Sequence, residues 1–249
     1  MRLTRVHVDA PLAVGLRVPL PAAVAAHLQR VLRLGEGDTC VLFNGDGQDY
    51  DARIHVAGKR ELLVDVTGAR AVDNESPLPV TLVQGVARGE KMDWILQKAT
   101  ELGVAAFVPV DSERSEVKLD AARAARRVAH WRSVLASACE QCGRARVPAI
   151  QAPSALARAL DALPEGGTRL LLDPGGTVDV DGLRLDDRLP MSVVLAVGPE
   201  GGWSPRDREQ LRSAGFAGLR LGPRILRTET AGIAAVAALQ ARWGDLRGA

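Results

Sequence analysis

The sequence predicts an α/β domain with a mainly parallel sheet, preceded by a small β-rich module. From Val80 onward, short apolar runs alternate with segments whose apolar residues recur at helical spacing. The run Val193–Val197 is apolar throughout, as expected for a strand covered on both faces. Ala71–Pro79 is polar and holds two prolines, so we place the domain boundary there. With 249 residues, the chain is long enough for two such domains.

The N-terminal module is expected to span residues 1–72. Cys40–Phe43 and Tyr50–Val56 have the composition of strands. Asn44–Gly47 lies between them and favours a hairpin, because Asn and Gly tolerate positive φ. Pro21–Leu34 repeats apolar residues at helical spacing, which predicts a helix.

The second domain, residues 73–249, is expected to alternate strands and helices. One helical face stops at Gly103, a residue type that commonly ends helices. The predicted strands are Val80–Gln84, Val104–Val110, Arg169–Asp173, Met191–Val197 and Leu219–Leu221, and the predicted helices are Met92–Leu102 and Leu119–Cys142. Gly175–Pro190 is expected to be a polar surface insertion.

The composition narrows the classes of function. The net charge is only +2, so any RNA contact must come from local basic patches such as Arg123, Arg126 and Arg127. Three cysteines indicate a reducing compartment rather than a disulfide scaffold. The chain shows no apolar leader and no run of eighteen apolar residues. We therefore expect a soluble, cytoplasmic protein without a membrane partner.

Several familiar site signatures are missing. There is no Gly-x-x-x-x-Gly-Lys-[Ser/Thr] phosphate loop and no Gly-x-Gly-x-x-Gly after an opening strand. Cys139 and Cys142 form a Cys-x-x-Cys pair inside a predicted helix, but no second Cys or His pair has suitable spacing for zinc. We therefore expect no metal site.

A first glycine loop, Gly198–Gly202, follows the buried strand. After it, Ser204 suits a helix N-cap, Pro205 the first helical position and Asp207 the acid of a capping box. Glycines at the carboxyl end of a parallel strand let the backbone approach a ligand closely. The same residues also suit a tight turn, so spacing alone leaves both interpretations open.

A second loop, Leu221–Thr230, again lies between a strand and a helix. Thr228 or Thr230 can cap the helix, while Arg227 and Glu229 place two charges at its start. These charges could line a pocket or form a solvated pair that suits the helix dipole. Two glycine loops at neighbouring strand ends favour a shared pocket.

The chain resembles the RsmE family of ribosomal RNA uridine-N3 methyltransferases, and the resemblance extends over nearly its whole length. Several spaced phrases carry it in order: Lys91–Asp93, Gln97–Gly103, Ser112–Ser115, Glu140–Arg144, Gly198–Gly202 and Leu221–Thr230. The resemblance implies a SPOUT-type α/β domain with a deep trefoil knot, a PUA-like RNA-binding barrel and a homodimer. It also implies S-adenosylmethionine as cofactor and 16S ribosomal RNA of the small subunit as substrate.

The resemblance also implies roles for individual residues. Cofactor contacts are expected from Leu172, Gly198, Glu200, Gly201, Gly202, Leu221, Gly222, Ile225 and Leu226. Arg114, Arg227, Glu140 and Glu229 are expected to stabilise the uracil anion or assist loss of its proton, in an order that the sequence leaves open. Arg5, Arg30 and Arg33 of the N-terminal module are expected to bind RNA. Two other functions remain open: a ribose 2′-O-methyltransferase and a non-catalytic RNA-binding assembly factor.

Overall fold

The computed structural model describes residues 4–57, 62–116, 120–184 and 191–247. The chain divides into two compact units. Unit 1 comprises Met1–Glu75 and Ala136–Val147, and unit 2 comprises Ser76–Leu135 and Pro148–Ala249. No sequence pattern had indicated that a later segment belongs with the N-terminal unit.

Unit 1 is built on one sheet, whose strand order is β1-β3-β4-β5-β2. Its strands are β1 (Arg5–His7), β2 (Arg17–Pro19), β3 (Thr39–Phe43), β4 (Gln48–Ala57) and β5 (Leu62–Ala71). β3 and β4 pair antiparallel, which confirms the predicted hairpin. Gly45 and Gly47 in its turn have φ of 93° and 94°. A side chain strains these angles, which explains why glycine occupies both positions.

The predicted N-terminal helix forms, but its second half has a different geometry. Ala22–Ala26 is α-helical (α1), and His27–Val31 continues as a π-helix (η1). Leu28 lies on the inner side of this segment and is fully buried in the core of unit 1. Apolar spacing predicts a helix but does not distinguish α from π hydrogen bonding.

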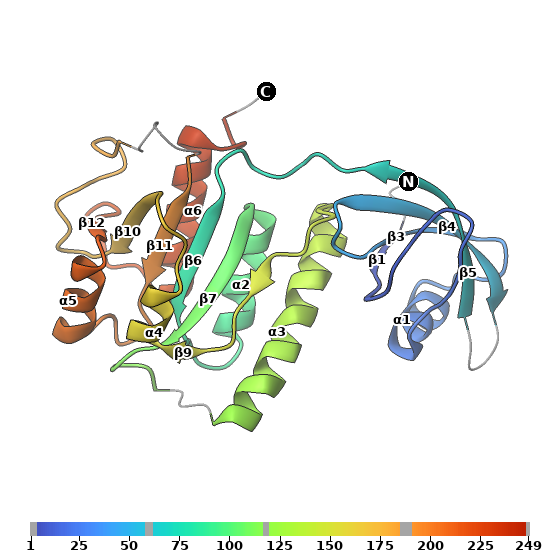
Figure 1. The fold of residues 1–249 in the computed structure, drawn as a ribbon, viewed down its shortest axis with the longest axis horizontal. Coiled ribbons are helices and arrows are strands. Elements are labelled where there is room, and N and C mark those ends of the chain that lie inside the picture. The colour runs from blue at the N-terminus through green and yellow to red at the C-terminus, as the bar shows by residue number, and fades with distance from the viewer. Residues whose placement is uncertain (1–3, 58–61, 117–119, 185–190, 248–249) are drawn as a thin grey trace. The chain divides into compact units, whose positions relative to one another are not determined.

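Unit 2 is an α/β domain with a parallel sheet, in the order β12-β10-β11-β6-β7-β8, and β9 pairs with β7 (Figure 1). Its strands are β6 (Val80–Gly85), β7 (Val104–Asp111), β8 (Ala149–Ile150), β9 (Ser154–Ala155), β10 (Thr168–Leu172), β11 (Val193–Val197) and β12 (Ala217–Leu219). Its helices are α2 (Lys91–Glu101), α4 (Leu156–Asp161), α5 (Pro205–Ser213) and α6 (Thr228–Trp243). α3 (Ala121–Cys142) begins in unit 2 and ends in unit 1.

Helices cover both faces of the sheet. Val194 and Ala196 of β11 pack in one cluster with Leu160 of α4 and Leu211 of α5. On the other face, α6 contacts β11 and α2. Val193–Val197 is buried at every residue, as the uniformly apolar sequence predicted.

Three details differ from the sequence prediction. The last strand spans Ala217–Leu219, two residues earlier than the predicted Leu219–Leu221. The stretch predicted as a surface insertion packs in part on the domain, since Leu183 is buried and Val178 bridges to Leu219. Residues 185–190 of that stretch, and Leu119 at the predicted start of α3, lie outside the described residues.

The described helices include none that is long and apolar enough to cross a membrane. Within the same residues, no cluster of three or more His, Cys, Asp or Glu side chains is arranged to hold a metal ion. The trefoil knot implied by the family resemblance stays a prediction.

Candidate functional site

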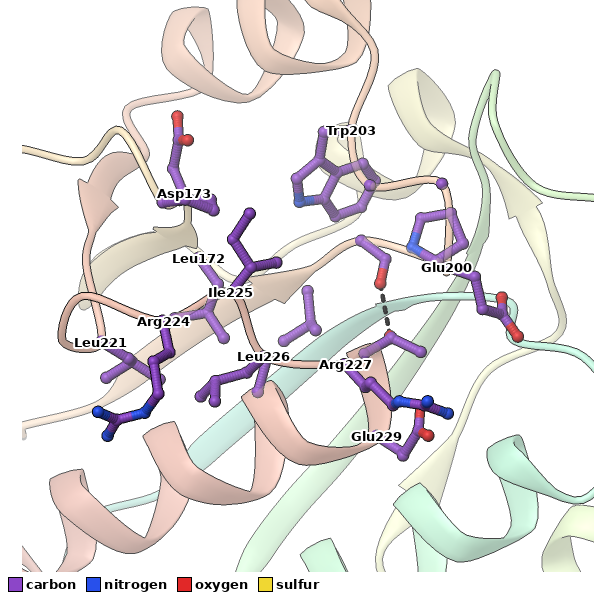
Figure 2. A pocket seen from close by; sticks show the side chains of 18 of the residues that line it. Leu172, Asp173, Glu200, Trp203, Leu221, Arg224, Ile225, Leu226, Arg227 and Glu229 are labelled. Atoms are coloured by element: carbon purple, nitrogen blue, oxygen red, sulfur yellow. Dashed lines mark hydrogen bonds between the residues drawn. The ribbon is translucent and has the colours of Figure 1, made fainter.

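A cavity of about 480 Å³ lies where β10, β11 and β12 end and α6 begins (Figure 2). It is bounded by both glycine loops and by the segment after β10. The lining comprises Arg88, Lys91, Leu172–Pro174, Val197–Trp203, Arg208, Leu219, Leu221, Gly222, Arg224–Glu229 and Ala231. Ligand sites of parallel α/β domains form at this carboxyl edge of the sheet. Every residue predicted to contact a cofactor lines this cavity, whereas the contacts themselves stay predictions.

Close backbone packing explains the glycines of the first loop. A Cβ on Gly198 would lie 3.0 Å from the carbonyl carbon of Gly202. A Cβ on Gly85, at the end of β6, would lie 2.5 Å from Cδ of Pro199. Real Cβ atoms avoid contacts this short, so larger residues would displace the loop. The tight-turn and ligand-binding interpretations of this loop are therefore compatible.

The helix after the first loop begins as predicted. Ser204 is the N-cap of α5, and its Oγ accepts a hydrogen bond from the Asp207 N–H at 3.0 Å. The Asp207 carboxylate accepts in return from the Ser204 N–H, also at 3.0 Å. Pro205 occupies the first turn. This capping box fixes the direction in which the chain leaves the cavity.

The prediction that Thr228 or Thr230 caps the last helix is wrong. The N-cap of α6 is Arg227, and no side chain caps it. The Thr228 hydroxyl instead donates to the Gly198 carbonyl at 2.6 Å, so it joins the second loop to the first. The Thr228 hydroxyl therefore bonds to the other loop and does not cap its own helix.

The inner walls of the cavity are apolar. Leu172, Val197, Leu221 and Leu226 contribute aliphatic side chains. Ile225 also belongs to the lining but leaves 84% of its surface exposed. A bound planar group packed on Ile225 would remove that apolar surface from water. The residues present therefore fit a ligand with a flat, partly apolar portion.

Glu200, Arg227 and Glu229 lie on one side of the cavity in Figure 2, whereas Asp173 and Arg224 lie on the other. Lys91 at the start of α2 places its Nζ 3.3 Å from the Glu200 carboxylate and 3.8 Å from that of Glu229. Burial raises the pKa of Glu200. Hydrogen bonds from backbone N–H groups, including that of Arg88, and the Lys91 ammonium outweigh burial and hold the pKa below its ordinary value.

Glu229 differs from Glu200 in its contacts. Its Oε2 is buried and has no hydrogen-bond partner among the residues that the structure describes, although the charge of Lys91 lies 3.8 Å away. Buried carboxylate oxygens normally accept a hydrogen bond, and an unsatisfied one calls for an explanation. A donor carried by a bound substrate would satisfy this oxygen.

Asp173 follows β10 and anchors the third segment of the cavity. Its carboxylate accepts hydrogen bonds from the Arg208 guanidinium and from the Gly175 N–H, and Arg212 lies 3.7 Å away. Burial raises the pKa of Asp173, but these hydrogen bonds and positive charges outweigh it and hold the pKa below its usual range. Asp173 therefore ties the end of β10 to α5. The sequence prediction had included Asp173 in the strand and named only Leu172 of this segment as a cofactor contact.

The four predicted catalytic residues occupy three different settings. Arg227 and Glu229 line the cavity. Arg114 follows β7, and its Nη1 donates to the Gly201 carbonyl at 3.0 Å, which places it beside the first glycine loop. Glu140 lies in unit 1, where it accepts a hydrogen bond from the His7 N–H at 2.9 Å. The described contacts thus give Glu140 a structural role within unit 1.

The predicted RNA-binding arginines differ in how far their side chains are exposed. The Arg5 side chain is 7% exposed, pairs with Asp49 at 2.6 Å and donates to the carbonyls of Cys139 and Arg144. These bonds hold the two segments of unit 1 together and leave little of the guanidinium accessible to phosphate. Arg30 and Arg33 are exposed, as an RNA contact requires. Sequence patterns could not separate the buried arginine from the exposed ones.

Two family models match the chain. An RNA methyltransferase domain matches residues 74–240, and an RNA methyltransferase PUA domain matches residues 20–67. These matches confirm the predicted combination of a PUA-like module with an α/β methyltransferase domain.

Similar proteins cover almost the whole chain. Ribosomal RNA small subunit methyltransferase E of Buchnera aphidicola subsp. Schizaphis graminum is 31% identical, with 98% of each chain covered. A structure of the enzyme of the same name from Neisseria gonorrhoeae, bound to S-adenosyl methionine, is 41% identical with a TM-score of 0.88 and covers 98% of this chain and 99% of that one. A Legionella pneumophila methyltransferase solved with SAM is 35% identical, with a TM-score of 0.92 and coverage of 98% and 100%. This chain belongs to the ribosomal RNA small subunit methyltransferase E family.

Proposed function

We propose that this chain transfers a methyl group from S-adenosylmethionine to RNA of the small ribosomal subunit. One observation carries the proposal: a single cavity, formed by both glycine loops, gathers every residue that the family resemblance assigns to the cofactor. The full-length similarity to an enzyme solved with S-adenosyl methionine supports the same cofactor here.

The residues present suit this cofactor. When bound, S-adenosylmethionine supplies a methyl carbon activated by its sulfonium sulfur. The aliphatic walls, with the exposed Ile225, would hold its adenine part and exclude water. Gly198 and Gly202 would let the backbone approach its polar groups. Holding donor and acceptor in line contributes about 7–11 kcal/mol at best to lowering the barrier.

We further propose that the methyl acceptor is N3 of a uridine. N3 becomes an effective nucleophile only when its proton leaves. We assign Oε2 of Glu229 to accept that proton, because Glu229 lines the cavity and this oxygen is buried without a hydrogen-bond partner among the described residues. Arg227, one residue before Thr228, would stabilise the negative charge that develops on the uracil carbonyl oxygens. Arg114 would support the first loop through the Gly201 carbonyl.

The substrate base must be accessible for this reaction. A uridine in a duplex keeps its N3–H paired, so the target is an unpaired or flipped nucleotide, which RNA loops supply.

We propose that Arg30 and Arg33 of unit 1 contribute phosphate contacts. We also propose that the protein acts as a homodimer and that it works in the cytoplasm.

The proposed function is tested with cofactor labelled in its methyl group. The protein is incubated with small ribosomal subunits from cells that lack the activity, and label in the extracted RNA is counted. We expect about one methyl group per subunit. Absence of label in RNA, with cofactor binding verified by calorimetry, would instead favour a non-catalytic RNA-binding assembly factor.

A further inference from the structure

The hydroxyl of Thr228 lies at a buried junction between the two loops of the cavity. Thr228 is 7% exposed, and its Oγ1 donates to the Gly198 carbonyl at 2.6 Å, a bond drawn as the dashed line in Figure 2. The same oxygen accepts a hydrogen bond from Nε2 of Gln84 at 3.1 Å. Both bonding directions of the hydroxyl are therefore used inside the protein.

Three chain segments converge on this junction. Gln84 lies in β6, is fully buried and pairs in register with Val197 of β11. Its Nε2 also donates to the Gly85 carbonyl at 2.9 Å. Gly198 is the first residue after β11, and Thr228 is the first residue of α6. One side-chain hydroxyl thus links the end of β11 to the start of α6.

The neighbours of Thr228 give this link a consequence for the reaction. Arg227 and Glu229 flank it in sequence and line the cavity. Gly198 belongs to the first loop, which lines the same cavity. A change at the hydroxyl therefore shifts the charged pair relative to the first loop, and misplacement by about 1 Å can cost about a hundredfold in rate.

We propose that Thr228 is a positioning residue, whose hydroxyl aligns the loop that holds the cofactor with the Arg227–Glu229 pair that faces the base. The inference rests on the proposed function, because it assigns those two parts to cofactor and base. The hydrogen bond that joins the two loops carries this role in alignment.

The test compares three variants of the full-length protein. Thr228→Val keeps the shape but removes the hydroxyl, and Thr228→Ser keeps the hydroxyl. Thr100→Val is a matched control, because Thr100 is also fully buried and donates to a carbonyl, that of Leu96 at 2.7 Å, but does not line the cavity. Loss of one such bond costs about 0.5–1.5 kcal/mol, and Thr228→Val loses two. Both Val variants should therefore melt at least a few degrees lower.

The variants should separate in kinetics and in hydrogen exchange. We expect Thr228→Val to lower kcat about tenfold to a hundredfold and to raise the Kd for S-adenosylmethionine about tenfold, with KM for RNA unchanged. Thr228→Ser should keep kcat and the Kd for S-adenosylmethionine near their wild-type values, and Thr100→Val should leave both unchanged. In ligand-free protein, Thr228→Val should speed amide exchange in residues 198–204 and 221–230, whereas Thr100→Val should not.

The outcomes distinguish this inference from the proposed function. Wild-type kinetics and loop exchange in Thr228→Val would overturn the positioning role, even if the wild-type protein methylates RNA. A kcat in Thr228→Ser as low as that in Thr228→Val would also overturn it, because the hydroxyl would then not be the group that sets the alignment. A wild-type protein without methyl transfer would refute the proposed function, while the exchange data would still decide whether Thr228 couples the loops.

Discussion

Arg227 and Glu229 are the charged residues that we propose act on the reacting base. Glu229 supplies a buried oxygen without a hydrogen-bond partner, and Lys91 places a positive charge 3.8 Å from it. Arg227 is exposed, so its guanidinium remains accessible to an incoming base. In the proposed reaction, Glu229 would accept the proton and Arg227 would stabilise the resulting anion.

Replacing Arg227 tests the anion-stabilising role. We expect Arg227→Met to lower kcat about a hundredfold to a thousandfold, the usual cost of losing one stabilising donor. The Kd for S-adenosylmethionine should change little, because the charge develops only during transfer. Arg158→Met is the matched control, since Arg158 is exposed on α4 away from the cavity. Equal kcat in the two variants would contradict the assignment.

The roles of some single residues could be predicted from the sequence, and those of others could not. The order of short motifs indicated Arg227 and Glu229, and both line the cavity. Arg5 and Arg30 looked alike in the sequence, yet one is buried on Asp49 and the other is exposed. Lys91 stood in a phrase that carries the family resemblance and Gln84 at the end of a predicted strand, but neither was predicted as a site residue, because their roles depend on contacts between distant segments.

At the scale of elements, the two glycine loops are the segments that bound the cavity. Their sequence predicted a tight turn, a capped helix and a ligand site, and the first two features are present in one connection between β11 and α5. The strands and long helices of unit 2 followed from apolar periodicity. β8, β9 and α4 could not be predicted, because two-residue strands and a six-residue helix are too short to show a period.

Gly198→Ala tests the loop geometry. The new Cβ would lie 3.0–3.1 Å from backbone atoms of Gly202 and Trp203, so the loop must shift. Overpacking costs about 1–3 kcal/mol, and we expect the Kd for S-adenosylmethionine to rise at least fivefold in calorimetry. Gly35→Ala is the control, because Gly35 has open space around its Cβ position and no positive φ. An unchanged Kd in Gly198→Ala would show that the loop does not contact the cofactor.

At the scale of the whole molecule, the chain interleaves its two units. Ala136–Val147 returns to unit 1, where Arg5 holds the carbonyls of Cys139 and Arg144, and Glu75 pairs with Arg144. Deleting residues 1–72 would remove Arg5, and with it the hydrogen bonds to the carbonyls of Cys139 and Arg144. The contribution of unit 1 to RNA binding is therefore better tested by substitution than by deletion.

The double variant Arg30→Gln/Arg33→Gln tests the RNA-binding surface. We expect weaker binding to small-subunit RNA and a salt slope reduced by about 0.7 for each lost contact with single-stranded phosphate. The control is Arg17→Gln in the same unit, because the Arg17 guanidinium already pairs with Asp65 at 2.7 Å. Equal salt slopes for the double variant and the control would assign RNA binding to another surface.

The homodimer is a prediction about assembly. Light scattering at micromolar concentration should give about twice the chain mass of 26.4 kDa. A fully active protein with the mass of one chain would exclude an active site that depends on two copies.

The position of the transferred methyl group tests the central claim most directly. After reaction with labelled cofactor and small subunits, the RNA is digested to nucleosides and analysed by mass spectrometry. We predict 3-methyluridine as the labelled product, strongly reduced in Glu229→Gln because the proton acceptor is lost. Label on the ribose, found as an alkali-resistant dinucleotide, would contradict the account and assign the protein to 2′-O-methylation.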